Sequence, residues 1–137
     1  MLWSEKYETG NKVVDSEHRQ IFDLVQKVLD ATFENRRDKM DTVMDFLVNY
    51  TVSHFENEER LMEESNYPDI AVHKKQHADF LAEVGKLKEQ IAIEENHVKN
   101  NLIINKTVVG WLTNHVLGSD MLIAKYYRKW ENVYKRN

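Results

Sequence analysis

Apolar residues recur every third or fourth position along four stretches of the chain. The recurring positions, in chain order, are Ile21 or Phe22, Val25 and Leu29; Val43 or Met44, Leu47 and Leu61; Ile70, Phe80 or Leu81, Val84, Leu87 and Ile91; and Ile104, Val108 and Trp111. Because an α-helix repeats every 3.6 residues, such positions lie on one face of a helix. The pattern therefore predicts four amphipathic helices.

Turn and capping residues set the expected boundaries of these helices. We predict helices over about residues 15–34, 40–64, 69–93 and 100–117, with Asp15 as the first cap. Pro68 ends the segment between the second and third helices. An arm over residues 1–14 and a short helix over about 120–134 complete the chain. The predicted fold class is all-α, an up-down-up-down four-helix bundle with an N-terminal arm and a short C-terminal helix, in one domain spanning residues 1–137.

Polar residues interrupt every apolar stripe at positions that should be buried. They are histidines and carboxylates: His18, His54, Glu58, His73, His77, His115 and Asp120. Burying such groups without partners destabilises a fold by on the order of several kcal/mol, comparable to the whole stability of a small domain. Either a hydrogen-bond network or a metal centre must satisfy them. The sixth histidine, His97, lies off every stripe in a polar connection and is predicted to be solvated.

The spacing of these residues favours the metal centre. His54 and Glu58 are four residues apart, as are His73 and His77, so each pair lies one turn apart on one side of a helix and can reach the same ion. Imidazoles and carboxylates together suit iron, manganese or zinc better than copper(I) or calcium. We therefore expect all seven residues to be metal ligands.

The last pair of expected ligands does not fit a regular helix. His115 and Asp120 are five residues apart, which is about 140° around an α-helix. We expect the fourth helix to end near Gly118 and a separate short helix to begin at about Asp120. A π-bulge within a continuous helix is the alternative.

Composition limits the classes of partner and compartment. The chain has 137 residues, no cysteine and a formal net charge of −4. Without cysteine, iron-sulfur and zinc-finger sites are excluded, and without a basic stripe we expect no nucleic-acid partner. No apolar run approaches the roughly 20 residues of a membrane span, and the first residues lack the features of a secretory signal. We expect a cytoplasmic protein.

The order of these motifs resembles a known family. A lone histidine followed by H-x-x-x-E, H-x-x-x-H and H-x-x-x-x-D, together with the segments W-S-E-K-Y and D-S-E-H, is similar to the hemerythrin family and in particular to its single-domain bacterial members. The resemblance implies two non-heme iron ions with an oxo or hydroxo bridge. It assigns His73, His77 and His115 to one ion and His18 and His54 to the other. Glu58 and Asp120 would bridge the two ions.

The resemblance also implies a pocket for dioxygen beside the two-histidine ion. Its lining would be apolar or aromatic: Ile21, Phe55, Trp111, Val116 and Leu117. Helical spacing independently places Ile21 and Trp111 on the ligand faces. Plain core packing is the alternative explanation for each of these residues, because a packed core uses the same residue types.

The function that the resemblance implies is reversible dioxygen binding, for transport, storage or delivery. In that case dioxygen is the partner, the protein is not an enzyme, and any protein client is unknown. Two alternatives stay open at this point. One is a di-iron enzyme or stress protein that reduces peroxide, dioxygen or nitric oxide, and the other is a sensor of oxygen or iron.

Overall fold

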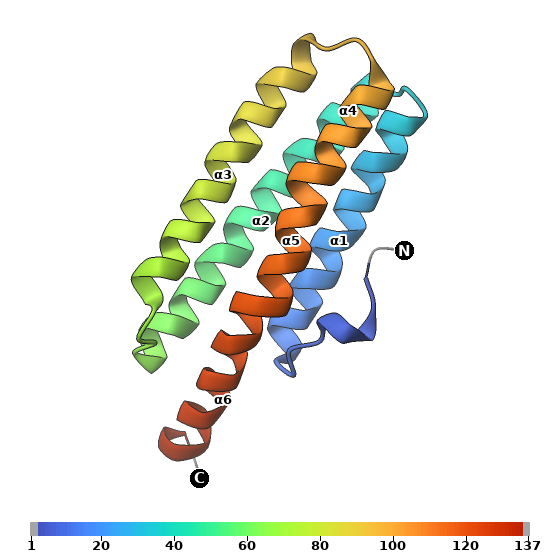
Figure 1. Cartoon of the computed structure of the whole chain (residues 1–137). Coiled ribbons are helices and arrows are strands. Elements are labelled where there is room, and N and C mark those ends of the chain that lie inside the picture. Colours follow the sequence, from blue (N-terminus) through green and yellow to red (C-terminus); the bar gives the residue numbers. More distant parts are fainter. Residues whose placement is uncertain (1–2, 136–137) are drawn as a thin grey trace.

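The computed structural model of the chain describes residues 3–135, and the ends of the predicted domain, residues 1–2 and 136–137, lie outside that part. Figure 1 shows the helices running up and down beside one another. Three long helices come first: α1 (Lys12–Phe33), α2 (Arg37–Ser65) and α3 (Ile70–Ile93). The fourth long helix consists of α4 (His97–Ile104), η2 (Asn105–Val109), α5 (Gly110–His115), η3 (Val116–Asp120) and α6 (Met121–Tyr134).

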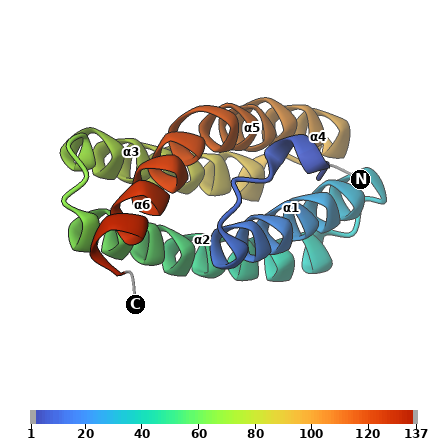
Figure 2. The same cartoon turned by 90° about the horizontal axis from the view of Figure 1, so that it is seen from below.

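The helices form the two layers expected of a four-helix bundle. In Figure 2, α1 and α2 lie in one layer, and α3 lies with α4 and α5 in the other. The buried core between them is built mainly from aliphatic and aromatic side chains, for example Val25, Leu87 and Ile104. The predicted all-α bundle is confirmed. Within residues 3–135, no helix combines the length and apolar character needed to cross a bilayer.

Two helices begin earlier than their predicted boundaries. Asn11 caps α1 by accepting hydrogen bonds from the backbone N–H groups of Val13 and Val14, each at 3.1 Å. The prediction that Asp15 caps this helix is wrong. Asp15 instead accepts hydrogen bonds from the backbone N–H and the hydroxyl of Thr9, both at 2.8 Å, and so ties the arm to α1. The second helix begins at Arg37 instead of residue 40.

The fourth helix also begins earlier, at His97, and this changes the position of that residue. Asn96 caps the helix by accepting a hydrogen bond from the N–H of Lys99 at 3.1 Å. His97 is half-buried, and its Nδ1–H donates to the carbonyl of Thr32 at 3.1 Å. The prediction of a solvated His97 is therefore wrong, because the side chain joins the start of α4 to the end of α1.

The fourth long helix does not break at Gly118. The backbone stays in the α region at Val116 (φ −64°, ψ −46°) and Met121 (φ −60°, ψ −41°), and residues 116–120 form a π-helical turn. The predicted break is wrong, and the alternative of a π-bulge in a continuous helix is correct. A second π-helical turn, η2, lies farther toward the start of the same helix.

The two π-helical turns keep one face of this helix buried over a long distance. Every fourth residue is buried: Asn100, Ile104, Val108, Leu112, Val116 and Asp120. A regular helix turns about 100° per residue, so the steps from Asn100 to Asp120 would leave the two side chains about 200° apart. Each π-helical turn accommodates one extra residue without adding to this rotation. With the extra residues of η2 and η3 left out, the rotation from Asn100 to Asp120 is about five full turns. Asp120 therefore faces the bundle interior.

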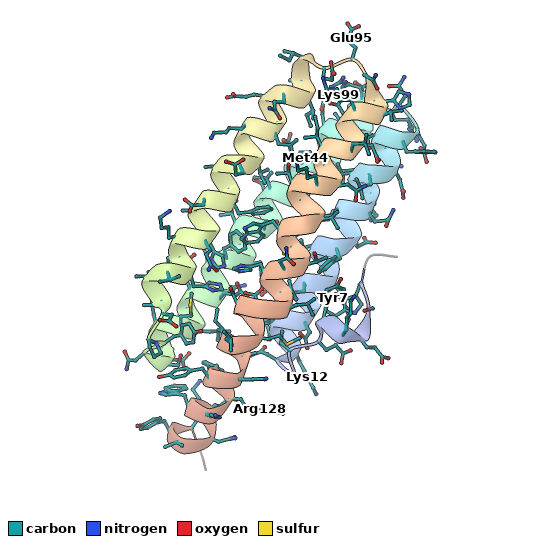
Figure 3. All side chains as sticks on the ribbon, viewed as in Figure 1. Tyr7, Lys12, Met44, Glu95, Lys99 and Arg128 are labelled. Carbon is teal, nitrogen blue, oxygen red and sulfur yellow. The ribbon has the colours of Figure 1, made fainter. Side chains whose placement is uncertain are left out.

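The arm packs against both α1 and the fourth long helix. It contains the short 3₁₀ helix η1 (Glu5–Tyr7), and Figure 3 shows Tyr7 between the arm and the bundle. The Tyr7 ring stacks on Phe22 with a centroid distance of 5.1 Å, and Trp3 meets the same Phe22 at 5.6 Å. These aromatic contacts hold the arm beside the helix that carries His18.

Candidate metal centre

The structure brings all seven predicted ligand residues together inside the bundle. Each of the four long helices contributes, and every one of the seven is buried. His18 comes from α1, and His54 and Glu58 come from α2. The remaining residues come from α3 and from the second half of the fourth helix: His73, His77, His115 and Asp120. Regular helical spacing predicts this meeting for every one of them except Asp120.

Glu58 lies between two sets of imidazoles and turns one oxygen toward each set. Its Oε1 is 3.1 Å from Nε2 of His77 and 3.6 Å from Nε2 of His73. Its Oε2 is 3.4 Å from Nε2 of His54 and 3.7 Å from Nε2 of His18. The same carboxylate can therefore reach an ion on either side.

Asp120 repeats this arrangement from the opposite helix. Its Oδ1 is 3.1 Å from Nε2 of His115 and 3.4 Å from Nε2 of His73. Its Oδ2 is 3.0 Å from Nε2 of His18. Glu58 and Asp120 thus have the positions of two carboxylates that bridge a pair of metal sites.

Two overlapping groups of potential ligands result from this geometry. The first is Glu58, His73, His77, His115 and Asp120, and the second is His18, His54, Glu58 and Asp120. Within each group the ligand atoms lie within 4.8 Å of one another. We call them the three-histidine half and the two-histidine half. Both halves share the two carboxylates.

The polar atoms at the centre need a partner that the protein does not supply. Nε2 of all five histidines is buried without a hydrogen bond, as are Oε1 of Glu58 and Oδ1 of Asp120. Buried polar atoms are almost always satisfied, and each orphaned atom destabilises the fold by about 1–3 kcal/mol. Lone pairs on nitrogen and oxygen that converge in this way fit metal ions. The residues present therefore suit a metal centre.

Two of the imidazoles bind protons strongly when no metal competes. Burial lowers the pKa of His54, but the charge of Glu58 and the contact with Glu17 outweigh burial and raise that pKa to about 10. Burial also lowers the pKa of His73, while Asp120 and Glu58 together raise it to about 9. Metal ions must displace protons from these residues in order to bind.

The two carboxylates stay ionised despite being buried. Burial raises the pKa of Glu58, but the neighbouring imidazoles, His54 first among them, hold it well below its usual value. Burial and the charge of Glu58 raise the pKa of Asp120, and the surrounding imidazoles lower it to about 2. Both groups are therefore in the form that coordinates metal.

Four of the five residues predicted to line an oxygen pocket lie close to the ligands or in the core. Ile21, Phe55 and Val116 are buried, and Trp111 is half-buried. The Phe55 ring stacks on His77 at 3.7 Å, and the Trp111 ring stacks on His115 at 4.1 Å.

Leu117 is placed differently from the other four. It is 43% exposed, because it follows the buried Val116 and is turned about 100° away from the buried face. Leu117 is therefore more exposed than the other four, and its place in the oxygen pocket stays a prediction.

Sequence reasoning missed the carboxylates that stand behind the ligands. Glu17 Oε1 is 3.0 Å from Nδ1 of His54, and Glu59 Oε2 is 3.5 Å from Nδ1 of His77. Both are charged residues next to a ligand in the sequence, which is the only signal that could have pointed to them. Periodicity along one helix cannot tell which residue of a neighbouring helix lies opposite.

Residues 9–127 match the model of the family described as the hemerythrin HHE cation binding domain. The chain belongs to the hemerythrin family. A solved structure of a leucine-to-phenylalanine mutant is similar in fold, with a TM-score of 0.79, 27% identity, and coverage of 93% of this chain and 96% of that one. The match agrees with the motif order found in the sequence.

Relatives within the hemerythrin family extend over most of the chain. A bacteriohemerythrin of Stenotrophomonas maltophilia is 31% identical, over 99% of this chain and 87% of its own. A bacteriohemerythrin of Methylococcus capsulatus is 30% identical, over 89% of this chain and 92% of its own. A myohemerythrin of Riftia pachyptila is 30% identical, over 87% of each chain.

Proposed function

We propose that this protein binds dioxygen reversibly at a di-iron centre, for oxygen transport, storage or delivery. The main observation behind the proposal is that Glu58 and Asp120 each turn one carboxylate oxygen toward each half of the centre. These oxygens lie 3.0–3.7 Å from the Nε2 atoms of the histidines. Membership of the hemerythrin family and the names of the relatives, bacteriohemerythrin and myohemerythrin, support it.

Each residue of the centre has a defined role in this proposal. His73, His77 and His115 would hold one iron, and His18 and His54 would hold the other, while Glu58 and Asp120 would serve both. When bound, the two irons and an oxo or hydroxo bridge would supply the electrons and the coordination position that dioxygen needs. The two-histidine half offers one protein ligand fewer than the three-histidine half.

The surrounding side chains favour a carrier over an enzyme. Ile21, Phe55 and Val116 are buried, apolar and close-packed, so they exclude water and carry no proton to donate. A site that holds dioxygen without consuming it needs such surroundings, whereas a reductase needs a supply of protons and electrons.

The test is a cycle of oxygenation on iron-loaded protein. The purified protein should contain close to two irons per chain, and the reduced form should develop a visible spectrum on oxygenation that disappears when oxygen is removed. Several cycles without loss of amplitude would support the carrier. Decay within seconds together with continuous consumption of reductant would instead identify an enzyme that reduces dioxygen, and one metal per chain would contradict the di-iron centre.

A further inference from the structure

The two halves of the centre hold their imidazoles by different physical means. This comparison rests on the proposed metal centre and concerns the ring atoms that face away from it. In metalloproteins the second ring nitrogen of a histidine ligand usually donates to a carboxylate or carbonyl, which fixes the tautomer and the ring plane. Only some of the five histidines here have such a partner.

In the two-histidine half, one imidazole has a strong partner. Glu17 comes from α1 and its Oε1 lies 3.0 Å from Nδ1 of His54 on α2. A carboxylate can only accept, so Nδ1–H of His54 donates, and Nε2 is the nitrogen that offers its lone pair to the centre once a metal ion displaces its proton. Nδ1 of His18, the other imidazole of this half, is buried without a hydrogen bond. Among residues 3–135, Glu17 is thus the one carboxylate bonded behind this half.

Glu17 is itself fixed from behind. The amide of Asn57 donates to Oε2 of Glu17 at 2.6 Å, and the guanidinium of Arg60 donates to the amide oxygen of Asn57 at 2.6 Å. Asn57 and Arg60 follow His54 on α2, so the bond from Asn57 to Glu17 ties α1 to α2 at the level of the centre. With Oε2 held by Asn57, the carboxylate turns Oε1 toward His54. Glu17 is 14% exposed, which limits competition from water.

In the three-histidine half, stacked rings replace this support. Phe55 lies on His77 at 3.7 Å with planes 4° apart, and Trp111 lies on His115 at 4.1 Å with planes 15° apart. The carboxylate of Glu59 is 3.5 Å from Nδ1 of His77 and is 28% exposed, so its contact is at the long limit of a hydrogen bond. Stacking fixes a ring plane but does not select a tautomer.

We propose that Glu17 is the positioning residue of the two-histidine half and determines whether that half retains its ion. This half has only two nitrogen ligands, so the basicity and tautomer of each matter more than in the half with three. Glu17 secures both properties for His54. Without the carboxylate, the two-histidine half should bind its ion more weakly, and the three-histidine half should fill first.

The test is an anaerobic titration of the metal-free protein with cobalt(II) alone. Visible absorption and calorimetry measure the binding of each ion. The parent should bind two ions. In Glu17→Gln, the affinity of one ion should fall at least about tenfold, the size typical for such partners, and the other should change little. In Glu59→Gln the loss should be smaller, about threefold or less. Glu56→Gln, an exposed residue of the same helix, controls for the change in net charge.

A spectral reference distinguishes positioning from general damage. His54→Ala removes the ligand itself, so the cobalt spectrum of Glu17→Gln at one equivalent should match that of His54→Ala. The melting temperature of the metal-free variants should stay near that of the metal-free parent. If Glu17→Gln and Glu59→Gln lose affinity equally, or if Glu17→Gln binds both ions like the parent, the proposal for Glu17 is wrong. If the parent binds fewer than two ions, the di-iron proposal itself fails.

Discussion

Helices α2 and α3 present their ligands differently from the fourth long helix. His54 and Glu58, and likewise His73 and His77, are four residues apart on unbroken α-helices. His115 and Asp120 are five residues apart, and the π-helical turn η3 lies between them. A regular helix brings ligands at a spacing of four to one ion, whereas a spacing of five needs a local change of the helix. The first arrangement is ordinary helix geometry, and the second depends on the site.

The position of Asp120 in the site therefore depends on the π-helical turn η3. Inserting a residue into a helix leaves one backbone group without its regular partner, so the turn is less favourable than the α-helix that could replace it. Asp120 is shared by both halves of the centre, so its interactions with two proposed ions can stabilise the turn. Neither α2 nor α3 requires such compensation.

The strongest way to break this difference is to add a further residue to η3. Insertion of one alanine after Gly118 exceeds the one extra residue that the π-helical turn accommodates, and should rotate Asp120 by about 100° relative to His115. Because both halves lose a shared carboxylate, iron content should fall from close to two per chain to below one, as we expect for Asp120→Ala. Metal analysis of the purified proteins measures this.

An insertion in the other π-helical turn serves as the matched control. Lys106 is exposed and lies in η2, far along the helix from the ligands. Insertion of one alanine after Lys106 should turn Asn100 and Ile104 out of the core and lower the unfolding free energy by about 2–5 kcal/mol, while iron content stays near two. If the two insertions lose iron equally, the special role of η3 is contradicted.

The sequence predicts α2 and α3 well and the fourth long helix less well, for the same reason. The ligands of α2 and α3 could be found from spacing, because a polar residue on a buried stripe is conspicuous. The continuous fourth helix could not be found from the ligand pair alone, since a break after His115 also satisfies a spacing of five. Burial at every fourth residue from Asn100 to Asp120 is the pattern that distinguishes π-helical turns from a break. The predicted stripe followed Ile104, Val108 and Trp111 and did not use this spacing.

Other features were out of reach for a different reason. Asp15 has the residue type of a helix cap, but Asn11 performs that role and Asp15 bonds to the arm. The choice between two capping residues a turn apart depends on where the arm packs, which is a tertiary property. The contact between Glu17 and His54 likewise joins two helices and has no local signal.

Removing the metal should affect η3 more than α2 or α3. Without ions the orphaned nitrogens and oxygens of the centre lose their partners, so the metal-free protein should be less stable by several kcal/mol, on the order of the binding energy, and melt well below the loaded form. Hydrogen exchange should show amides of residues 116–120 exchanging sooner than those of residues 54–58. Uniform acceleration across all helices, or equal melting temperatures, would be inconsistent with this prediction.

His54 on α2 and His73 on α3 should make the stability of the metal-free protein depend on pH. The pKa values of His54 and His73 are about 10 and 9 in the fold, against about 6.5 in an unfolded chain. The folded state thus holds more protons above pH 6.5, so this stabilisation is complete below that pH and is lost as the pH rises toward 9–10.

Chemical unfolding of metal-free protein between pH 6 and 10 measures this effect. We expect a loss on the order of 1 kcal/mol or more across the range. The iron-loaded protein serves as the control, because its ligand nitrogens bind metal in place of the extra protons and should show a weaker dependence. A metal-free protein whose stability rises over the same range would contradict the sign of the prediction.

The smallest expected effect is the difference between alanine variants of two neighbouring residues of η3. Val116 and Leu117 are neighbours on the π-helical turn, but Val116 is 1% exposed and Leu117 is 43% exposed. Val116→Ala should lower the unfolding free energy by about 2 kcal/mol and, by opening space beside the centre, shorten the life of the oxygenated spectrum. Leu117→Ala should change stability by less than about 1 kcal/mol and leave that lifetime within about twofold of the parent. Both variants should keep close to two irons per chain, so decay rates can be compared at equal loading. If Leu117→Ala shortened the lifetime more than Val116→Ala, the exposed side chain would be the one that protects the bound oxygen, and the surface position found for it would not describe the oxygenated protein.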